Sequence, residues 1–249
     1  MKQTAADVRG RLRGLGFDDA DAGVLADHFL DSEARGRPSH GLARVAWLET
    51  LADLQPRARP ARVVAEPGFE RWDGRGALGY LTLAAIVDAQ LAAPPTPARV
   101  VVAGDCFPTG ALGYWVRRLA RSGLAAALTA TSPPRLPHPQ GGPPLAGTNP
   151  LAIAVPSSDG QPLVADVSMG KVTYGDVLAG TASDDELVPF GGEQAHKAFA
   201  LAVGLHALVD ALAGPGYGAL LVVVRAEADP VPSLRERAHE AGVRLPGDR

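Results

Sequence analysis

The segment ARVVVAGDCFPTGALGYWVRRLARSGLAAALTAT, residues 98–131, carries the clearest signal of fold class in the chain. Residues 98–103 form an apolar, β-branched run that is typical of a strand, and residues 124–131 form another. Between them, residues 111–122 have the apolar spacing of a helix, and we expect this helix to direct Arg117, Arg118 and Arg121 outward. A strand, a helix and a strand in succession predict an α/β architecture.

The same kind of pattern extends in both directions from this segment. We expect helices over residues 4–15 and 18–33, the first capped by Thr4, and a third helix that begins at the cap Ser39 and ends near residue 54. After a linker at 56–60, strands are expected over 62–65, 151–155, 162–166 and 219–225, and helices over 80–93, 197–213 and 233–241, of which 197–213 is expected to be buried. The chain therefore divides into a helical N-terminal region (1–60), an α/β core (61–225) and a C-terminal helical region (226–249) that we expect to pack back on the N-terminal region.

Composition argues against several classes of protein. The chain has 249 residues, of which 46% are apolar, and its net charge of −3 gives no reason to expect a nucleic-acid partner or an anionic membrane. Cys106 is the single cysteine, so an intrachain disulfide and a cysteine-rich metal site are excluded, and we expect no metal. Residues 1–15 lack the apolar segment of a signal peptide, and we read no apolar run as long and uninterrupted enough to span a bilayer. These features predict a cytoplasmic protein with no membrane partner.

The sequence Ser39-His40-Gly41-Leu42-Ala43-Arg44 places an imidazole and a guanidinium four residues apart. On a continuous helix, residues at this spacing share a face, so both side chains would reach one small molecule. Arginine is suited to binding a carboxylate with two parallel hydrogen bonds, and histidine to proton transfer near neutral pH. The pair fits a substrate with a carboxylate beside a C=O or C=N group, although His and Arg at this spacing also occur on solvated helix faces.

The segment Gly74-Arg75-Gly76-Ala77-Leu78-Gly79 satisfies the dinucleotide pattern G-x-G-x-x-G and precedes an expected helix. However, residues 66–73 lack the apolar run of a central parallel strand, and no acidic residue ends a strand about 20 positions later. The alternative is a glycine-rich turn in front of a helix.

Three further segments have the composition of ligand-binding loops. Gly147-Thr148-Asn149-Pro150 precedes an expected strand, residues 166–171 follow one, and residues 191–197 open a helix. Strand ends and helix starts are favoured ligand positions in α/β proteins. Each segment also has a purely structural explanation as a capped turn, a satisfied strand-end aspartate or a flexible helix entry.

In this order the segments resemble the malate/L-lactate dehydrogenase-like oxidoreductases. That family includes ureidoglycolate, sulfolactate and diketogulonate dehydrogenases and the piperideine- and pyrroline-carboxylate reductases. The motifs that carry the resemblance are Ser39-His40-Gly41 with Arg44, Gly147-Thr148-Asn149-Pro150, Asp166-Val167-Ser168-Met169 with Tyr174-Gly175, and His196-Lys197-Ala198-Phe199-Ala200-Leu201. The Ser-Met and Tyr-Gly portion is most similar to the diketogulonate reductase branch.

The resemblance implies a non-Rossmann, sulfolactate dehydrogenase-like α/β fold with a mixed sheet, a homodimer, and hydride transfer from NADH or NADPH to a small carboxylated substrate. It implies that His40 is the proton donor or acceptor, with Asp166 as its catalytic partner. Substrate binding would fall to Ser39, Arg44, Thr148 and Asn149. Cofactor binding would fall to Asp166, Val167, Ser168, Met169, Gly170, Lys171, His196 and Lys197. The resemblance also implies that residues 74–79 form a turn typical of this family and are not a Rossmann dinucleotide-binding motif.

The chain departs from the family pattern at several positions. A histidine that relatives carry before the helix at residue 111 is missing from Phe107-Pro108-Thr109-Gly110, and two glycines of the Lys-Gly-Tyr-Gly-Leu motif have become Ala198 and Ala200. The segments between 174 and 189 and after 225 are short for the family. We therefore expect either a reductase of 2-oxo or 2-imino acids, or a divergent relative that binds a small acid or a partner without redox catalysis.

Overall fold

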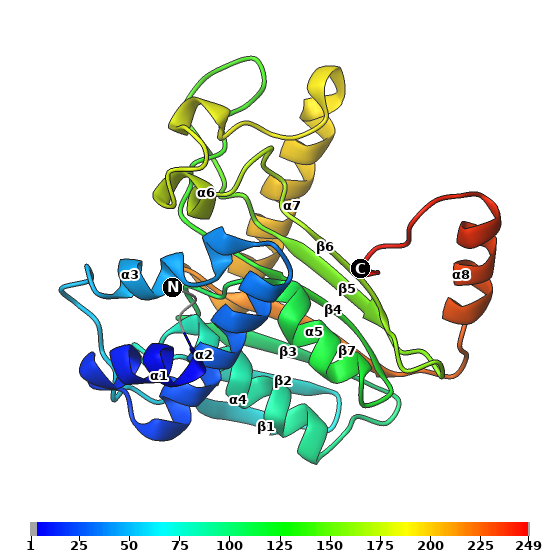
Figure 1. Cartoon of the computed structure of the whole chain (residues 1–249), viewed down its shortest axis with the longest axis horizontal. Helices are drawn as coiled ribbons and strands as arrows, with labels where there is room; N and C mark the ends of the chain where they lie inside the picture. Colours follow the sequence, from blue (N-terminus) through cyan, green and yellow to red (C-terminus); the bar gives the residue numbers. More distant parts are fainter. Residues whose placement is uncertain (1–3, 249) are drawn as a thin grey trace.

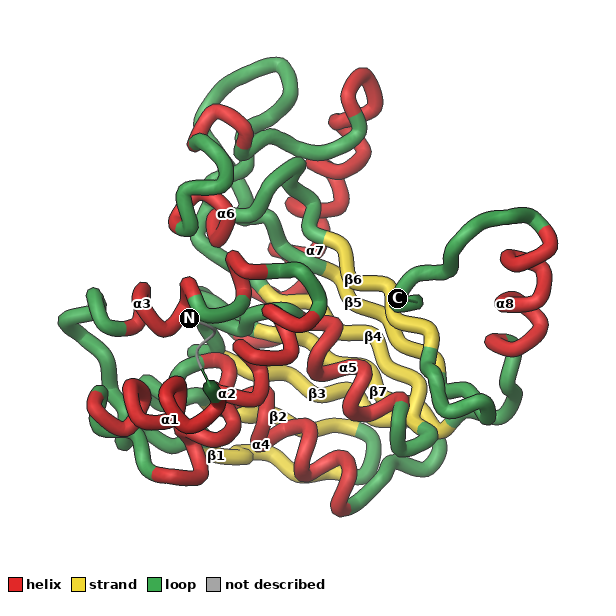
Figure 2. The backbone as a smooth tube through the Cα atoms, in the orientation of Figure 1, coloured by secondary structure: helices red, strands yellow, loops and turns green. Residues whose placement is uncertain are grey.

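The computed structural model describes residues 4–248, which build one seven-stranded sheet with helices on both faces (Figures 1 and 2). The helices are α1 (Ala5–Gly14), α2 (Asp19–Ala34), α3 (Ala43–Leu48), α4 (Gly79–Ala92), α5 (Leu112–Ala120), α6 (Tyr174–Leu178), α7 (Ala195–Ala213) and α8 (Val231–Glu240). The strands are β1 (Ala61–Glu66), β2 (Phe69–Asp73), β3 (Ala98–Gly104), β4 (Leu124–Ala130), β5 (Leu151–Val155), β6 (Leu163–Val167) and β7 (Ala219–Arg225). Short 3-10 turns are η1 (Pro38–His40), η2 (Asp184–Glu186) and η3 (Gly192–Gln194).

The order and direction of the strands define the topology of the sheet. They follow one another as β1-β2-β3-β7-β4-β5-β6, with β2 and β3 parallel and each other adjacent pair antiparallel. A Rossmann domain instead has a mostly parallel sheet. The predicted mixed, non-Rossmann sheet is confirmed.

The two faces of the sheet are covered unequally. Helices α2, α4 and α5 form a layer in front of it in Figure 1, and α7 passes behind β3, β4 and β7. The front layer holds the main core, where Phe29, Tyr80, Ile86, Trp115 and Leu128 are fully buried. The residues of β5 that face α5, Ala152 and Ala154, are also buried, whereas Ile153 on the opposite side is exposed. The back of the sheet is therefore only partly covered.

The predicted cap of the first helix, Thr4, is confirmed. Thr4 accepts a hydrogen bond from the Asp7 backbone while the Asp7 carboxylate accepts one from the Thr4 backbone, and Asp18 caps α2. These bonds satisfy backbone N–H groups that a helix start would otherwise leave without partners.

Two predictions about helix exposure were wrong. Arg117 is buried rather than outward, because α2 lies over that side of α5 and supplies Asp31 as its ion-pair partner. Helix α7 is buried on one side only, with Ala195, Ala198, Ala202 and Val209 enclosed and Leu201 and Leu208 exposed. By length and composition alone, residues 192–213 are long and apolar enough to cross a membrane, a property that core helices of soluble proteins also have.

The C-terminal helix occupies a different place from the one expected. Helix α8 stands beside the β5–β6 hairpin, far from α1 (Figure 1). Arg235 of α8 forms an ion pair with Asp159 in the turn of that hairpin, and the Ser158 backbone donates to Asp229 just before the helix. Only the following tail comes near the N-terminal region, where Arg244 and Asp248 line a cleft with the end of α2.

The glycine-rich turn at 74–79 connects β2 to α4 and packs against residues 105–108. Segment 69–73 is a strand after all, with Trp72 as a buried residue, even though it has no long apolar run. A Cβ at Gly74 would overlap the Asp105 carbonyl oxygen, and a Cβ at Gly79 would lie 2.8 Å from the Phe107 nitrogen. The glycines are thus explained by close backbone packing, as expected for a structural turn.

Candidate active site

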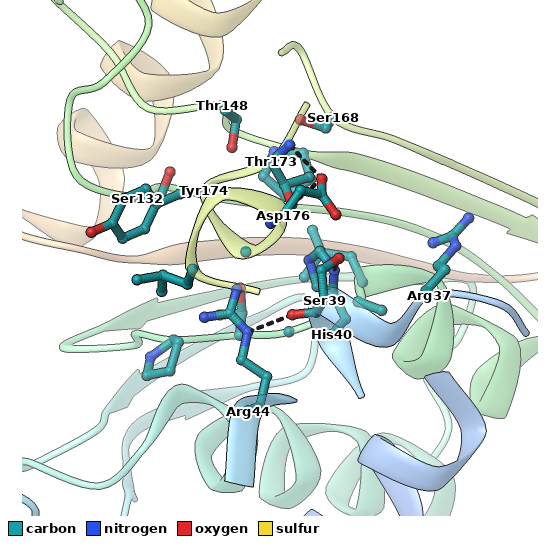
Figure 3. Close-up of a pocket in the computed structure, with 18 of the residues that line it drawn as sticks. Arg37, Ser39, His40, Arg44, Ser132, Thr148, Ser168, Thr173, Tyr174 and Asp176 are labelled. Carbon is teal, nitrogen blue, oxygen red and sulfur yellow. Dashed lines mark hydrogen bonds between the residues drawn. The ribbon is translucent and has the colours of Figure 1, made fainter. Parts of the chain in front are cut away.

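A cavity of about 550 Å³ opens between the N-terminal region and the loops that follow β3, β4 and β6 (Figure 3). Its volume lies within the usual range for small-molecule sites. It is lined by polar groups on the η1–α3 segment, on α6 and on β6, and by an apolar side that includes Tyr80, Phe107 and Leu112. The site is therefore assembled from segments more than a hundred residues apart in the chain.

His40 and Arg44 both line this cavity, although not from one helix. His40 ends η1, Gly41 breaks the chain direction, and Arg44 lies in α3, so the predicted Ser39-capped helix was wrong. The break is fixed by Glu33 of α2, whose carboxylate accepts the Leu42 N–H at 2.7 Å and occupies the space that a side chain at position 41 would need. His40 and Arg44 therefore come together through this turn and not as neighbours on one face of a continuous helix.

Two contacts hold the guanidinium of Arg44 on one side. The Arg44 Nε donates a hydrogen bond to the Ser39 carbonyl oxygen at 2.8 Å, and the Arg44 Cζ lies 5.4 Å from the centre of the Trp47 ring. Within the described residues it forms no ion pair with a carboxylate, so its two terminal nitrogens remain for an anion in the cavity. This is the geometry that a carboxylate-binding arginine requires.

His40 is neutral at physiological pH in this environment. Burial, followed by the positive charge of Arg44, lowers its pKa to about 4, while Asp166 and Asp176 act in the opposite direction. Its Nδ1 lies 3.2 Å from the Ser39 hydroxyl oxygen, which leaves Nε2 for a ligand. An anion on Arg44 would offset part of the charge that disfavours the imidazolium.

Asp166 reaches the cavity from β6, but its bonded partner is Arg37. The two side chains form an ion pair of 2.5 Å across the wall of the cavity. A Cβ at Gly113 of α5 would lie 2.9 Å from the carboxylate, so this glycine leaves room for Asp166. Asp166 influences His40 electrostatically, and Arg37, which sequence reasoning missed, holds the carboxylate in place.

Helix α6 closes the opposite side of the cavity and was also missed. Thr173 and Asp176 form a capping box at its start, which is a pattern visible in the sequence. Burial alone would raise the pKa of Asp176, but hydrogen bonds from Ser39 and Thr173 outweigh it and the pKa is lowered. A Cβ at Gly175 would overlap the Arg44 guanidinium, so a side chain at this position would displace that guanidinium. Arg135 stacks on Tyr174, 3.6 Å from its ring centre, and joins the loop after β4 to this helix.

The structure brings about half of the predicted site residues together. Those that line the cavity are Ser39, His40, Arg44, Thr148, Asp166 and Ser168. The other predicted residues lie outside its lining: Asn149, Val167, Met169, Gly170, Lys171, His196 and Lys197.

Asn149, which we expected to bind substrate, instead has a structural role. It is fully buried, accepts from the Ser132 N–H at 3.1 Å and donates to the Ala202 carbonyl at 2.9 Å. It thereby ties the loops beside the cavity to α7. Lys171 forms an ion pair with Glu186, and Lys197 is exposed at the start of α7.

Residues 2–186 match the family model described as malate/L-lactate dehydrogenase. The chain belongs to this family. Among curated relatives, the malate/L-lactate dehydrogenase family member described here is 34% identical over 175 residues to a (2R)-3-sulfolactate dehydrogenase (NADP(+)) of Chromohalobacter salexigens, over 67% of this chain and 51% of that one. It is 27% identical over 228 residues to a Delta(1)-pyrroline-2-carboxylate/Delta(1)-piperideine-2-carboxylate reductase of Pseudomonas putida, over 80% of this chain and 66% of that one. The chain thus spans about half to two thirds of the length of these relatives.

Solved structures share the fold of this family member. A dehydrogenase from Sinorhizobium meliloti superposes with a TM-score of 0.79 at 26% identity, covering 100% of this chain and 90% of that one. A delta1-piperideine-2-carboxylate reductase from Pseudomonas syringae superposes with a TM-score of 0.85 at 24% identity, covering 100% of this chain and 91% of that one. The second likeness supports the fold alone.

Proposed function

We propose that this family member is an NAD(P)H-dependent reductase that transfers hydride to C2 of a small 2-oxo acid or cyclic 2-imino acid. The observation that carries the proposal is that one cavity holds both His40 and the guanidinium of Arg44, which has no carboxylate partner among residues 4–248. Relatives named for reduction of a cyclic imino acid and for oxidation of a 2-hydroxy acid support the substrate class.

In this mechanism Arg44 binds the substrate carboxylate with its two terminal nitrogens and turns the adjacent C=O or C=N group toward His40. Binding of the carboxylate offsets the positive charge beside the imidazole, and Asp166 and Asp176 favour protonation further. His40 then holds the proton at Nε2 and gives it to the substrate oxygen or nitrogen. In the reverse direction the neutral imidazole accepts that proton.

The cavity fits the reactive end of the implied cofactor. Reduced nicotinamide supplies the hydride when it is bound, and the apolar side formed by Phe107, Pro108 and Leu112 suits a planar ring that must be shielded from water. Lys171 and Lys197, which we expected to bind the rest of the cofactor, lie outside the lining. The fit therefore concerns the nicotinamide and the substrate, and it does not distinguish NADH from NADPH.

We further propose that the enzyme works as a homodimer in the cytoplasm. Exposed apolar residues support the dimer: Ile153 and Val167 on β5 and β6, and Leu201 and Leu208 on α7. The single cysteine, Cys106, is a free thiol, which is compatible with a reducing compartment.

A second candidate is a protein that binds a small acid without redox chemistry. It is favoured by the low pKa of His40 and by the stretch Phe107-Pro108-Thr109-Gly110 in the cavity wall, which lacks the histidine that the family resemblance implies there. Titration with NADH and NADPH, followed by melting temperature, tests whether the cofactor binds, since a ligand that binds only the folded state raises the melting temperature.

The proposed activity is tested by a screen of NADH and NADPH oxidation against 2-oxo acids and cyclic 2-imino acids. A reductase consumes the cofactor only when an acceptor is present. Cofactor binding without turnover on any acceptor would favour the second candidate.

A further inference from the structure

Tyr80, the second residue of α4, brings a hydroxyl to the apolar side of the cavity. The side chain is fully buried and forms part of the cavity lining, yet its hydroxyl oxygen has no hydrogen-bond partner among residues 4–248. Most buried side-chain polar atoms have at least one partner, and a buried polar atom without one lowers the stability of the fold. The Tyr80 hydroxyl therefore has a bonding capacity that the free chain does not use.

The ring of Tyr80 is held in one position by its neighbours. His28 and Phe29 of α2 pack against it edge to face, with ring centres 5.0 and 5.3 Å from that of Tyr80. Gly110, in the loop after β3, leaves room for the edge of the ring, since a Cβ there would lie 2.3 Å from the Tyr80 Cε1. Packing of this kind fixes the place of the hydroxyl before any ligand binds.

His28 is the polar neighbour in this packing, and it does not satisfy the hydroxyl. Its Nε2 accepts the Ala111 N–H at 3.2 Å, and its Nδ1 has no partner. Burial lowers the pKa of His28 well below its ordinary value, so the ring is neutral. A neutral ring whose Nε2 accepts a hydrogen bond carries its own proton on Nδ1, and it has no atom left to accept the proton of the Tyr80 hydroxyl.

Arg44 lies close enough to Tyr80 for its charge to act on the hydroxyl. Burial raises the pKa of Tyr80, and the positive charge of Arg44 offsets part of this rise. The hydroxyl is therefore protonated at neutral pH and can donate a hydrogen bond. The guanidinium has donors only, so it cannot accept that bond. An acceptor held by Arg44 in the cavity would supply what both side chains lack.

We propose that the Tyr80 hydroxyl is a further hydrogen-bond donor for the substrate carboxylate, beside the two terminal nitrogens of Arg44. A carboxylate has about four acceptor positions on its two oxygens, which is enough for all three donors. A neutral carboxamide has a single acceptor oxygen, so three donors around one group favour an acid. The proposal rests on the role of Arg44 in the proposed function, and it adds a residue that none of the sequence motifs marked.

Tyr80→Phe tests the proposal because it removes only the hydroxyl. Oxamate and pyrrole-2-carboxylate are planar acids that resemble a 2-oxo acid and a cyclic 2-imino acid, and their binding is measured by calorimetry with and without NADPH or NADH. We expect Kd to rise ~10-fold or more, as for loss of a hydrogen bond to a charged group. Tyr217→Phe is the matched control and should leave Kd unchanged: its ring centre lies 5.0 Å from that of Phe107, outside the cavity lining.

The melting temperature of the ligand-free chain separates substrate binding from a structural role. If the hydroxyl has no partner in the free protein, Tyr80→Phe melts at the wild-type temperature or above it, although it binds the acid more weakly. A melting temperature below that of the wild type would show that the hydroxyl is already bonded within the free chain, and it would overturn the proposal.

Comparison with Arg44→Gln shows whether the two side chains bind the same group. We expect the double variant with Tyr80→Phe to lose less affinity than the product of the two single losses, because both side chains contact one carboxylate. Independent effects would place the hydroxyl on another group and contradict the proposal. An unchanged Kd in Tyr80→Phe, with weaker binding in Arg44→Gln, would remove Tyr80 from the site and leave the proposed function intact. No binding of either acid to the wild type would overturn both this proposal and the role of Arg44 in the proposed function.

Discussion

Replacing Arg44 with glutamine should separate substrate binding from turnover in this cavity. The guanidinium is anchored by one hydrogen bond from Nε to the Ser39 carbonyl and presents its terminal nitrogens to the ligand. Hydrogen bonds to a charged partner are worth ~1.5–3 kcal/mol each, so loss of a two-pronged carboxylate pair should cost ~3 kcal/mol and raise KM ~100-fold. If the contact is equally strong in the ground state and the transition state, kcat changes much less than KM.

The same substitution should change the pH dependence. The positive charge of Arg44 is the second cause, after burial, that holds the pKa of His40 near 4. Its removal raises that pKa. Because kcat/KM reports groups of the free enzyme, the limb of the kcat/KM profile that belongs to His40 should move to higher pH in the variant.

The assay is NAD(P)H oxidation at varied substrate concentration and pH, for wild type, Arg44→Gln and Arg37→Gln. Arg37 is the matched control: it is also a guanidinium in the cavity lining, but it is already paired with Asp166. We expect a much smaller change of KM for Arg37→Gln. The reasoning is refuted if both variants raise KM equally, or if Arg44→Gln lowers kcat while leaving KM and the pH profile unchanged.

Four further results are expected. His40→Gln should lower kcat by ~10²–10⁴-fold with little change in the binding of NADPH, and unchanged turnover would remove its role in proton transfer. Gly175→Ala should raise KM by displacing the Arg44 guanidinium, whereas Gly23→Ala, a helical site with open space, should not; equal kinetics for the two variants would contradict this geometry. Asn149→Ala should lower the free energy of unfolding by ~2 kcal/mol in urea titration, because two buried hydrogen bonds are lost, and an unchanged midpoint would argue against its structural role. His40 has a folded pKa of about 4 against ~6.5 when unfolded, so the unfolded state binds the extra proton between these values. Stability is then complete above pH 6.5 and falls as the pH drops toward 4, by up to ~3 kcal/mol from this group, and the slope should be shallower in His40→Gln.

The sequence predicted the architecture well wherever local patterns and core packing agree. The strands and the helix of residues 98–131 and the Thr4 cap follow directly from apolar spacing and a capping residue. Strand β2 was hard to recognise because Glu70 stands inside it; this carboxylate is buried and bonded by Trp72 and Gln90. No periodicity signal reveals such a buried polar cluster.

Tertiary contacts explain where the prediction of the site went wrong. The Glu33 carboxylate at Gly41 replaces the expected continuous helix with a turn, yet it still brings His40 and Arg44 together. The pairing of Asp166 with Arg37, 129 residues away in sequence, has no local signature. By contrast, Thr173 and Asp176 form a capping box that could have marked α6.

Helix α7 shows a different limit of sequence analysis. Its composition is that of a buried helix, yet Leu201 and Leu208 on its outer side are exposed. Apolar composition alone therefore does not show how much of a helix is enclosed in the folded chain.

The most direct test of the central claim follows the hydride itself. The wild-type chain is incubated with NADPH or NADH carrying deuterium at C4, as each stereoisomer, and with 2-oxo acids or cyclic 2-imino acids, and the products are analysed by mass spectrometry. We predict one deuterium at C2 of the product from one stereoisomer of the cofactor, and a much slower appearance of the label with His40→Gln. Binding of the cofactor without label in any product, or labelling that is equally fast without His40, would contradict the account.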